Sequence, residues 1–242
     1  MLDTIILLTG ETELPALTAC LLGHNLHLTI LAVCTLADLL AVPSSVLRRA
    51  RLIGFSTPVV VPREILDRLG YGAYNFHPGS PEFPGWAPAS FAVYRRAAEF
   101  GATAHMMTER VDEGPIIGVD RFSVSPGSDV AEVERLAYFH LARLFWRFAK
   151  DLATRSMPLP VLPVRWNGRK TSRKIFQAMC DIPLDISKEE LDRRLKAFGG
   201  NCSGVSPAIN LHGVRFALSP DTAASRAPGI PPLQTGLPAL AV

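Results

Sequence analysis

Short aliphatic runs alternate with helix-like segments along most of the chain, and this alternation constrains the fold more than any other feature. The first run, residues 5–8, is continuously aliphatic and ends in Thr9-Gly10, as expected of a strand buried on both faces. Further strand-like runs lie at residues 28–35, 50–57, 73–77 and 101–107 and after Gly114, and helical patterns occupy residues 13–22, 62–69, 90–101 and 129–153. We read Gly101 as the residue that closes the third of these helices. The alternation predicts an α/β fold with a Rossmann-like, doubly wound and mostly parallel sheet.

The sequence changes in character after residue 157. A proline-broken segment leads to a helical pattern that starts at Ser187, with Glu190 three residues on, and stops at Gly199-Gly200. A hairpin with its turn at His212-Gly213 follows. We therefore expect a catalytic core at residues 1–157, a small helix-plus-hairpin subdomain at 158–219 and a disordered tail at 220–242, where Pro, Ala, Ser and Gly dominate.

Composition limits the compartment and the partners. With 242 residues, 48% hydrophobic content and a mean hydropathy of +0.20, the chain can bury a full core. Its 25 basic and 22 acidic residues leave a formal charge of +3 without a long block of one sign, so nucleic acid is not an expected partner. The four cysteines are far apart and form no C-x-x-C pair, which disfavours a zinc or disulfide framework and fits a reducing cytoplasm.

Two segments that could suggest a membrane or secretion are better explained as core. The apolar stretch at residues 26–43 is short and is interrupted by His27 and Asp38, so we do not expect it to span a membrane. At the start of the chain, Asp3 stands where a signal peptide carries positive charge.

Two polar side chains stand together at the end of a strand, in the stretch "AYNFH". Because alternate strand residues point to the same face, Asn75 and His77 project together while Phe76 faces the other side. In open α/β sheets, ligands bind outside the carboxyl ends of the strands. Alone, the pair could also be a turn-forming asparagine and a loop histidine before a proline.

The wider pattern around this pair is more specific. Its elements are Asn75-x-His77-Pro78, Gly85, Gly101-x-Thr103-x-His105 and Asp112-x-Gly114-x-Ile116-Ile117. In order and spacing the pattern resembles the signature of the 10-formyltetrahydrofolate-dependent formyltransferases, and the layout is most similar to the catalytic domains that act on sugar-nucleotide amines or on methionyl-tRNA. The family also contains a formyltetrahydrofolate hydrolase.

The resemblance implies a catalytic set. Asn75 would donate to the oxyanion formed when an amine attacks the formyl carbon, His77 would assist as a donor or acid/base, and Asp112 would orient His77. The co-substrate would be 10-formyltetrahydrofolate, and no metal is required.

The resemblance also implies residues around that set. The expected folate-binding residues are Phe55, Ser56, Thr57, Glu109 and Val111, and the expected supporting residues are Thr103, His105 and Gly114. A buried strand end is an equal alternative for residues 55–57. For His105, a role in which it only supports the Asp112 loop is at least as well founded as direct participation in the chemistry.

Two departures from the family weaken the inference of the acceptor. The loop after His77-Pro78 reads "GSPEFPG" instead of the family's usual residues, and the part before Asn75 is shorter by about one strand-helix unit. The expected fold is therefore a formyltransferase fold with a shortened N-terminal half.

The loop after the first strand informs the choice of amine. Glu11 and Glu13 at the start of the following helix would repel phosphate, which disfavours glycinamide ribonucleotide. The low charge surplus disfavours tRNA. We expect an N-formyltransferase that acts on a small amine such as an amino sugar nucleotide. We expect no membrane partner, and the sequence is compatible with a homodimer. A formyltetrahydrofolate hydrolase and a folate-binding protein without turnover remain alternatives.

Overall fold

The computed structural model describes residues 2–200 and 204–219, and the predicted disordered tail lies outside these residues. The chain forms two compact units, residues 1–178 and 179–242. The core boundary expected at residue 157 stays a prediction. Eight helices occupy the described residues: α1 (Leu14–Leu22), α2 (Leu36–Leu40), α3 (Ser44–Leu47), α4 (Arg63–Leu66), α5 (Pro88–Tyr94), α6 (Val130–Thr154), α7 (Arg173–Cys180) and α8 (Lys188–Phe198).

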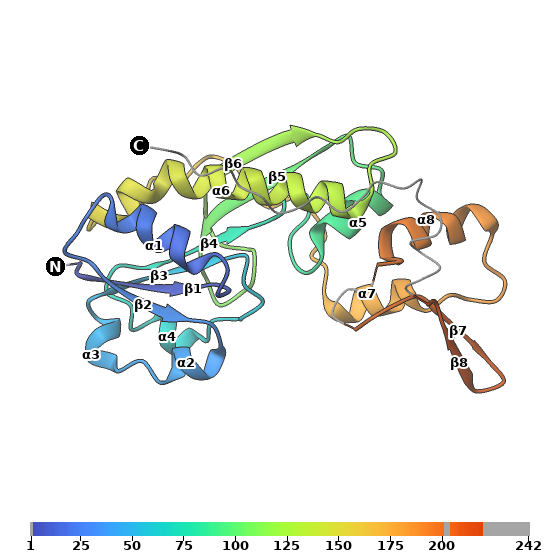
Figure 1. Ribbon diagram of the computed structural model, residues 1–242, viewed down its shortest axis with the longest axis horizontal. Helices are drawn as coiled ribbons and strands as arrows, with labels where there is room; N and C mark the ends of the chain where they lie inside the picture. The colour runs from blue at the N-terminus through green and yellow to red at the C-terminus, as the bar shows by residue number, and fades with distance from the viewer. Residues whose placement is uncertain (1, 201–203, 220–242) are drawn as a thin grey trace, which may run out of the picture. The chain divides into compact units, whose positions relative to one another are not determined.

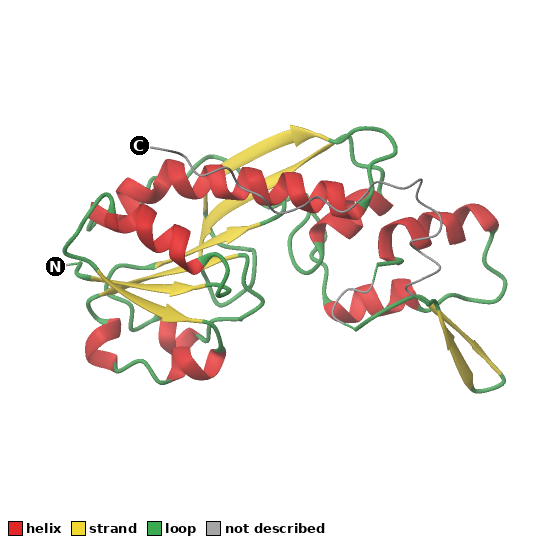
Figure 2. Cartoon of the chain, viewed as in Figure 1, coloured by secondary structure: helices red, strands yellow, loops and turns green. Residues whose placement is uncertain are grey.

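The first unit is built on a six-stranded sheet with the order β2-β1-β3-β4-β5-β6 (Figure 2). Its strands are β1 (Thr4–Leu8), β2 (Thr29–Val33), β3 (Ala50–Phe55), β4 (Ala73–His77), β5 (Glu99–Met106) and β6 (Ile116–Ser123). Strand β1 pairs in parallel with β2 and β3, and β3 pairs in parallel with β4. Strand β5 pairs antiparallel with both β4 and β6. The predicted α/β fold with a mostly parallel sheet is therefore confirmed.

Helices cover both faces of this sheet. One face packs against α1 and α6, and the opposite face packs against α2, α3 and α4 (Figure 1). Strand β4 divides its side chains between the two sides. Tyr74 and Phe76 enter the core beneath α6, while Ala73 enters the core on the other side. Asn75 and His77 alternate with these aromatic residues, so they project away from α6.

The helix predicted at residues 90–101 is wrong in its second half. Helix α5 ends at Tyr94, Arg96 takes the left-handed conformation (φ 52°), and the chain then enters β5. Gly101 lies inside β5, where an added Cβ would stand 2.3 Å from the Asp120 carbonyl oxygen of β6. This glycine therefore permits close strand pairing and does not end a helix.

The second unit contains α8 and a separate two-stranded hairpin, β7 (Ala208–Leu211) and β8 (Val214–Ala217). The Ser187 hydroxyl caps α8 by accepting from the Glu190 backbone N–H. His212 and Gly213 both have positive φ, 50° and 81°, as a two-residue hairpin turn requires. The predicted helix and hairpin are both confirmed.

One arginine is buried in the first unit. Arg51 on β3 is 0% exposed, and its guanidinium donates to the carbonyl groups of Tyr71, Asp151, Leu152 and Arg155. Three of these carbonyls lie at the C-terminal end of α6 or on its C-cap residue Arg155, where the last backbone acceptors lack donors within the helix; the Asp151 carbonyl also accepts from the Arg155 N–H at 3.0 Å. Arg51 therefore ties the longest helix to the sheet.

We predict that Arg51→Met lowers the free energy of unfolding by about 2 to 4 kcal/mol, because buried carbonyls lose their donors. Urea denaturation of the variant and of wild type measures the loss. Arg49→Met is the matched control. Arg49 is exposed and forms a surface ion pair with Asp3, so its loss should cost less than about 1 kcal/mol. Equal losses for both variants would contradict the proposed role of Arg51.

Candidate active site

Asn75 lies in a row of three residues across the sheet. The register pairs it with Gly54 of β3 on one side and with His105 of β5 on the other. An added Cβ at Gly54 would stand 2.9 Å from Asn75 Oδ1 and 2.7 Å from Met107 Cε, so a larger residue there would displace these side chains. On the other side, Asn75 Nδ2 lies 3.2 Å from His105 Nε2.

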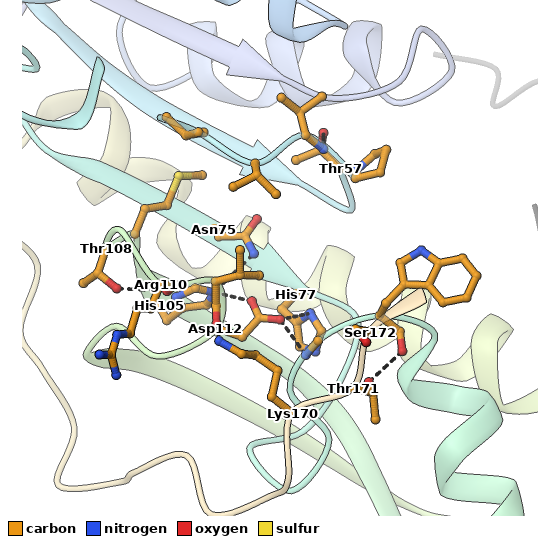
Figure 3. Close-up of a pocket in the computed structure, with 18 residues that line it drawn as sticks. Thr57, Asn75, His77, His105, Thr108, Arg110, Asp112, Lys170, Thr171 and Ser172 are labelled. Atoms are coloured by element: carbon orange, nitrogen blue, oxygen red, sulfur yellow. Dashed lines mark hydrogen bonds and ion pairs between the residues drawn. The ribbon is translucent and has the colours of Figure 1, made fainter. Parts of the chain in front are cut away.

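Asp112 joins the two histidines. Its carboxylate lies 3.4 Å from His77 Nδ1 and 3.2 Å from His105 Nε2, and it accepts the backbone N–H of Gly85 at 2.8 Å (Figure 3). All three side chains are nearly fully buried. Asp112 has φ 48°, a left-handed conformation that costs free energy and recurs at functional sites. Asn75 joins this group through His105, so the structure brings the predicted catalytic residues Asn75, His77 and Asp112 into one cluster.

Backbone carbonyls fix which ring nitrogens carry protons. His77 Nε2 lies 3.0 Å from the Phe83 carbonyl oxygen, so it donates, and Nδ1 is left to face Asp112. His105 Nδ1 likewise donates to the Met106 carbonyl at 2.8 Å. A neutral His105 ring can then accept from Asn75 at Nε2, and a charged ring can donate to Asp112 from the same atom.

Burial and charge shift the pKa values of the pair in this cluster. Burial alone would raise the pKa of Asp112, but the charge of His77 and the contact with His105 outweigh it and hold the pKa at about 2. Burial lowers the pKa of His77, and the attraction of Asp112 opposes that effect only in part. Near neutral pH the cluster therefore holds an ionised carboxylate beside a neutral His77 that can accept a proton.

The cluster opens into a cavity of about 380 Å³, a size that suits a small molecule. Its walls combine an apolar side, an aromatic side and the polar cluster: Thr57, Pro58, Val59, Val60, Val61, Asn75, His77, Gly85, Trp86, His105, Met107, Thr108, Arg110, Val111, Asp112, Lys170, Thr171 and Ser172. A flat ring system could pack on the apolar side while its reactive end faces the polar cluster.

The residues predicted to bind folate separate into two groups. Thr57 and Val111 line the cavity, as a binding role requires. Phe55 is 1% exposed and packs in the core, Ser56 is exposed at the strand end with φ 47°, and Glu109 pairs with an arginine of α4. These three do not line the cavity.

The residues predicted to give support lie around the cluster. His105 belongs to the cluster itself. Thr103 is buried and donates to the Gly79 carbonyl at 2.7 Å, which holds the loop that follows His77. Gly114 packs so closely that a Cβ would stand 1.9 Å from the Met106 carbonyl oxygen.

Residues 164–172, which we call the covering segment, contribute to the site but were not predicted to do so. Lys170, Thr171 and Ser172 line the cavity, and Trp166 contacts both histidines. The only local signal is the polar and aromatic run "WNGRK" between prolines, which has no periodicity.

Among residues 2–200 and 204–219, no group of three His, Cys, Asp or Glu side chains could hold a metal ion. In the same part of the chain, no helix has the length and apolar character needed to cross a membrane.

We predict that Asp112→Asn lowers the pKa of His77 further, because the variant removes the larger of the two effects that oppose burial, the other being the hydrogen bond to the Phe83 carbonyl. In ¹⁵N-histidine NMR titrations, His77 should titrate below about 6.5 in wild type and lower still in the variant. Asp120→Asn is the matched control, because Asp120 lies 3.1 Å from His140 on α6, away from the cluster. An unchanged or raised His77 midpoint in Asp112→Asn would contradict the described electrostatics.

Comparisons with known proteins find formyltransferases. Residues 54–140 match the family model described as formyl transferase. The methionyl-tRNA formyltransferase of Dechloromonas aromatica is 30% identical over 142 residues, which make up 58% of this chain and 44% of that protein. The chain thus matches less than half the length of this relative.

Solved structures extend the likeness to most of the chain. A sugar N-formyltransferase from a Shewanella species has a TM-score of 0.70 at 15% identity, covering 90% of this chain and 96% of that one. An N-formyltransferase from Helicobacter canadensis, in complex with folinic acid and dTDP-3-aminofucose, has a TM-score of 0.62 at 11% identity, covering 88% and 85%. Residues 54–140 thus match a formyl transferase model, and they lie within a fold similar to those of solved N-formyltransferases.

Proposed function

We propose that the chain is an N-formyltransferase that moves a formyl group from 10-formyltetrahydrofolate to the primary amine of a small acceptor, such as an amino sugar nucleotide. One observation carries the proposal: Asn75, His77 and Asp112 meet at the wall of a single cavity in a formyltransferase core. The cytoplasm, as expected from the cysteine pattern, is the proposed compartment.

The cavity suits the proposed donor. Residues 58–61 and Met107 give the cavity an apolar lining that suits a flat heterocycle, and the polar cluster lines the same cavity. The Helicobacter canadensis neighbour was solved with folinic acid, which is chemically a formylated folate. We infer that the donor places its ring on the apolar side and its formyl group at Asn75.

Asn75 is suited to stabilise the oxyanion. An amide nitrogen carries two N–H donors, and His105 Nε2 engages only one of them at 3.2 Å. The second is available to the oxygen of the formyl group, which gains negative charge as the amine attacks. A fixed donor of this kind acts mainly in the transition state and therefore raises the rate more than the affinity.

His77 is suited to take up the proton that the attacking amine must lose. Its Nε2 is committed to the Phe83 carbonyl, so Nδ1 is the ring atom that can accept a proton. Asp112, 3.4 Å from Nδ1, stabilises the resulting positive charge and keeps the ring oriented. No other component is needed to balance the transfer, because the reduced folate leaves with a proton on its nitrogen.

The acceptor is inferred from charge. The sequence relative is a methionyl-tRNA formyltransferase by name, and so is one similar structure, from Clostridium thermocellum. Another similar structure is of a sugar N-formyltransferase, and a third was solved with dTDP-3-aminofucose. A formal charge of +3 gives little of the phosphate attraction on which binding to a polynucleotide depends. A small amine is therefore the better proposal.

The proposal is tested by incubation of the protein with 10-formyltetrahydrofolate and a panel of amines that includes amino sugar nucleotides and methionyl-tRNA. We expect a formylated small amine and release of tetrahydrofolate. Formate release without any amine would instead identify a hydrolase. Folate binding without loss of the formyl group would identify a binding protein.

We predict that Asn75→Asp lowers turnover by about a hundredfold to a thousandfold or more, because a carboxylate replaces the donor to the oxyanion. The affinity for a formylfolate analogue should fall far less. Asn210→Asp on β7 makes the same chemical change at an exposed position of the other unit and should be silent. Turnover of Asn75→Asp within about tenfold of wild type would remove Asn75 from the mechanism.

We also predict how wild-type kcat/KM depends on pH. Because burial lowers the pKa of His77, the neutral ring persists into mildly acidic solution. The acid limb of the profile should therefore have its midpoint below about 6.5, the usual histidine value. A midpoint above that value would argue against His77 as the proton acceptor.

A further inference from the structure

We propose that Trp166 is a positioning residue of this site: its indole holds the His77 and His105 rings and the loop that bears Asp112 in one fixed arrangement. The kinetic part of the inference rests on the proposed function, whereas the structural part stands without it. Trp166 belongs to the covering segment, far along the chain from the strands that carry the histidines.

A single indole contacts both histidines of the cluster and the loop that follows Asp112. Its ring lies edge-on to His77, with the centroids 5.8 Å apart at 69°, and edge-on to His105, at 5.1 Å and 88°. Edge-to-face packing of aromatic rings is favourable and directional. In addition, Trp166 Nε1 donates to the Gly114 carbonyl at 2.9 Å, two residues after Asp112. Trp166 therefore links two strands and one loop at the reacting atoms.

The covering segment is held firmly enough to position other groups. The backbone N–H groups of Asn167 and Gly168 donate to the Pro81 carbonyl, at 3.2 and 3.3 Å. An added Cβ at Gly168 would stand 1.8 Å from the Glu82 carbonyl oxygen, so the covering segment packs directly on the backbone at Glu82. Thr171 donates from its backbone to Pro84 at 3.0 Å.

The covering segment and the cluster share one partner, the loop at residues 81–86. This loop supplies the Phe83 carbonyl that accepts from His77 and the Gly85 N–H that donates to Asp112. The same loop also bonds to Thr171 in both directions: the Thr171 N–H donates to the Pro84 carbonyl, and the Trp86 N–H donates to the Thr171 carbonyl at 3.2 Å. A shift of the covering segment would therefore reach His77 and Asp112 along two routes, through the indole and through this loop.

Trp166 also shields His77 from water. The titratable and charged groups around His77 are Asp112 and His105, and Arg110 and Lys170 line the same cavity. With these charges unchanged, loss of the indole exposes the His77 ring to solvent. Its pKa should then rise toward the ordinary histidine value, because burial is the main cause of its lowering.

The test compares Trp166→Phe, Trp166→Ala and the control Trp146→Phe, whose tryptophan is 52% exposed on α6. The first readout is the ¹⁵N-histidine NMR titration of the intact chain, which needs no substrate. We expect the His77 midpoint to rise clearly in Trp166→Ala, to move less in Trp166→Phe and to stay unchanged in Trp146→Phe. Trp166→Phe keeps one aromatic ring but loses the N–H donor and part of the ring area, so it also serves if the alanine variant does not fold.

The second readout is steady-state kinetics with the best amine of the panel. Small displacements of reacting groups can cost about a hundredfold in rate, so we expect kcat to fall by about tenfold to a hundredfold in Trp166→Ala with KM changed much less. Trp166→Phe should recover part of the loss.

The inference is overturned if folded Trp166 variants keep the wild-type His77 titration, or if Trp166→Ala retains wild-type kcat. If wild type transfers no formyl group, the proposed function fails, while the NMR readout still decides the positioning role.

Discussion

A carboxylate out of contact with water keeps its charge only when polar groups surround it, and Asp112 is held in this way. The Gly85 N–H donates to it at 2.8 Å, and the two histidine rings lie at 3.2 and 3.4 Å, where a protonated ring would pair with the carboxylate. Each partner is itself held by the backbone, since His77 donates to Phe83 and His105 donates to Met106. The members of the cluster thus support one another, and displacement of one removes part of the support of a buried charge.

The topology of the sheet explains how such a cluster can form at one edge. Parallel strands end together, which places Asn75 and His77 at the carboxyl edge of the sheet. The next strand, β5, runs antiparallel, and its register sets His105 directly beside Asn75. A fold with only parallel strands would need a loop to supply this second histidine. Here, a rigid strand pair supplies it.

Residues whose roles depend on local pattern could be predicted from the sequence. The strand containing Asn75 and His77 is short and alternates, and the spacing to Asp112 matches a known signature, so the cluster could be named in advance. Gly101 was misread because a glycine that ends a helix and a glycine that permits strand pairing look alike without the partner strand. The local pattern was sufficient for the cluster and insufficient for Gly101.

Residues whose roles depend on distant contacts could not be predicted. Arg51 interrupts an aliphatic strand, and its partners at the end of α6 are about a hundred residues away. Trp166 and Thr171 lie in a proline-broken segment without periodicity, and they reach the site only because the chain returns to the loop at residues 81–86. Such contacts leave no periodic trace in a single sequence.

The most direct measurement of the central claim, that the formyl group reacts at this cluster, is a crystal structure of the protein with a stable formylated folate such as folinic acid. The account predicts that the folate ring lies on the apolar wall at residues 58–61 and that the formyl oxygen lies within about 3 Å of Asn75 Nδ2. A folate bound with its formyl group turned away from Asn75 and His77, or bound outside this cavity, would contradict the account.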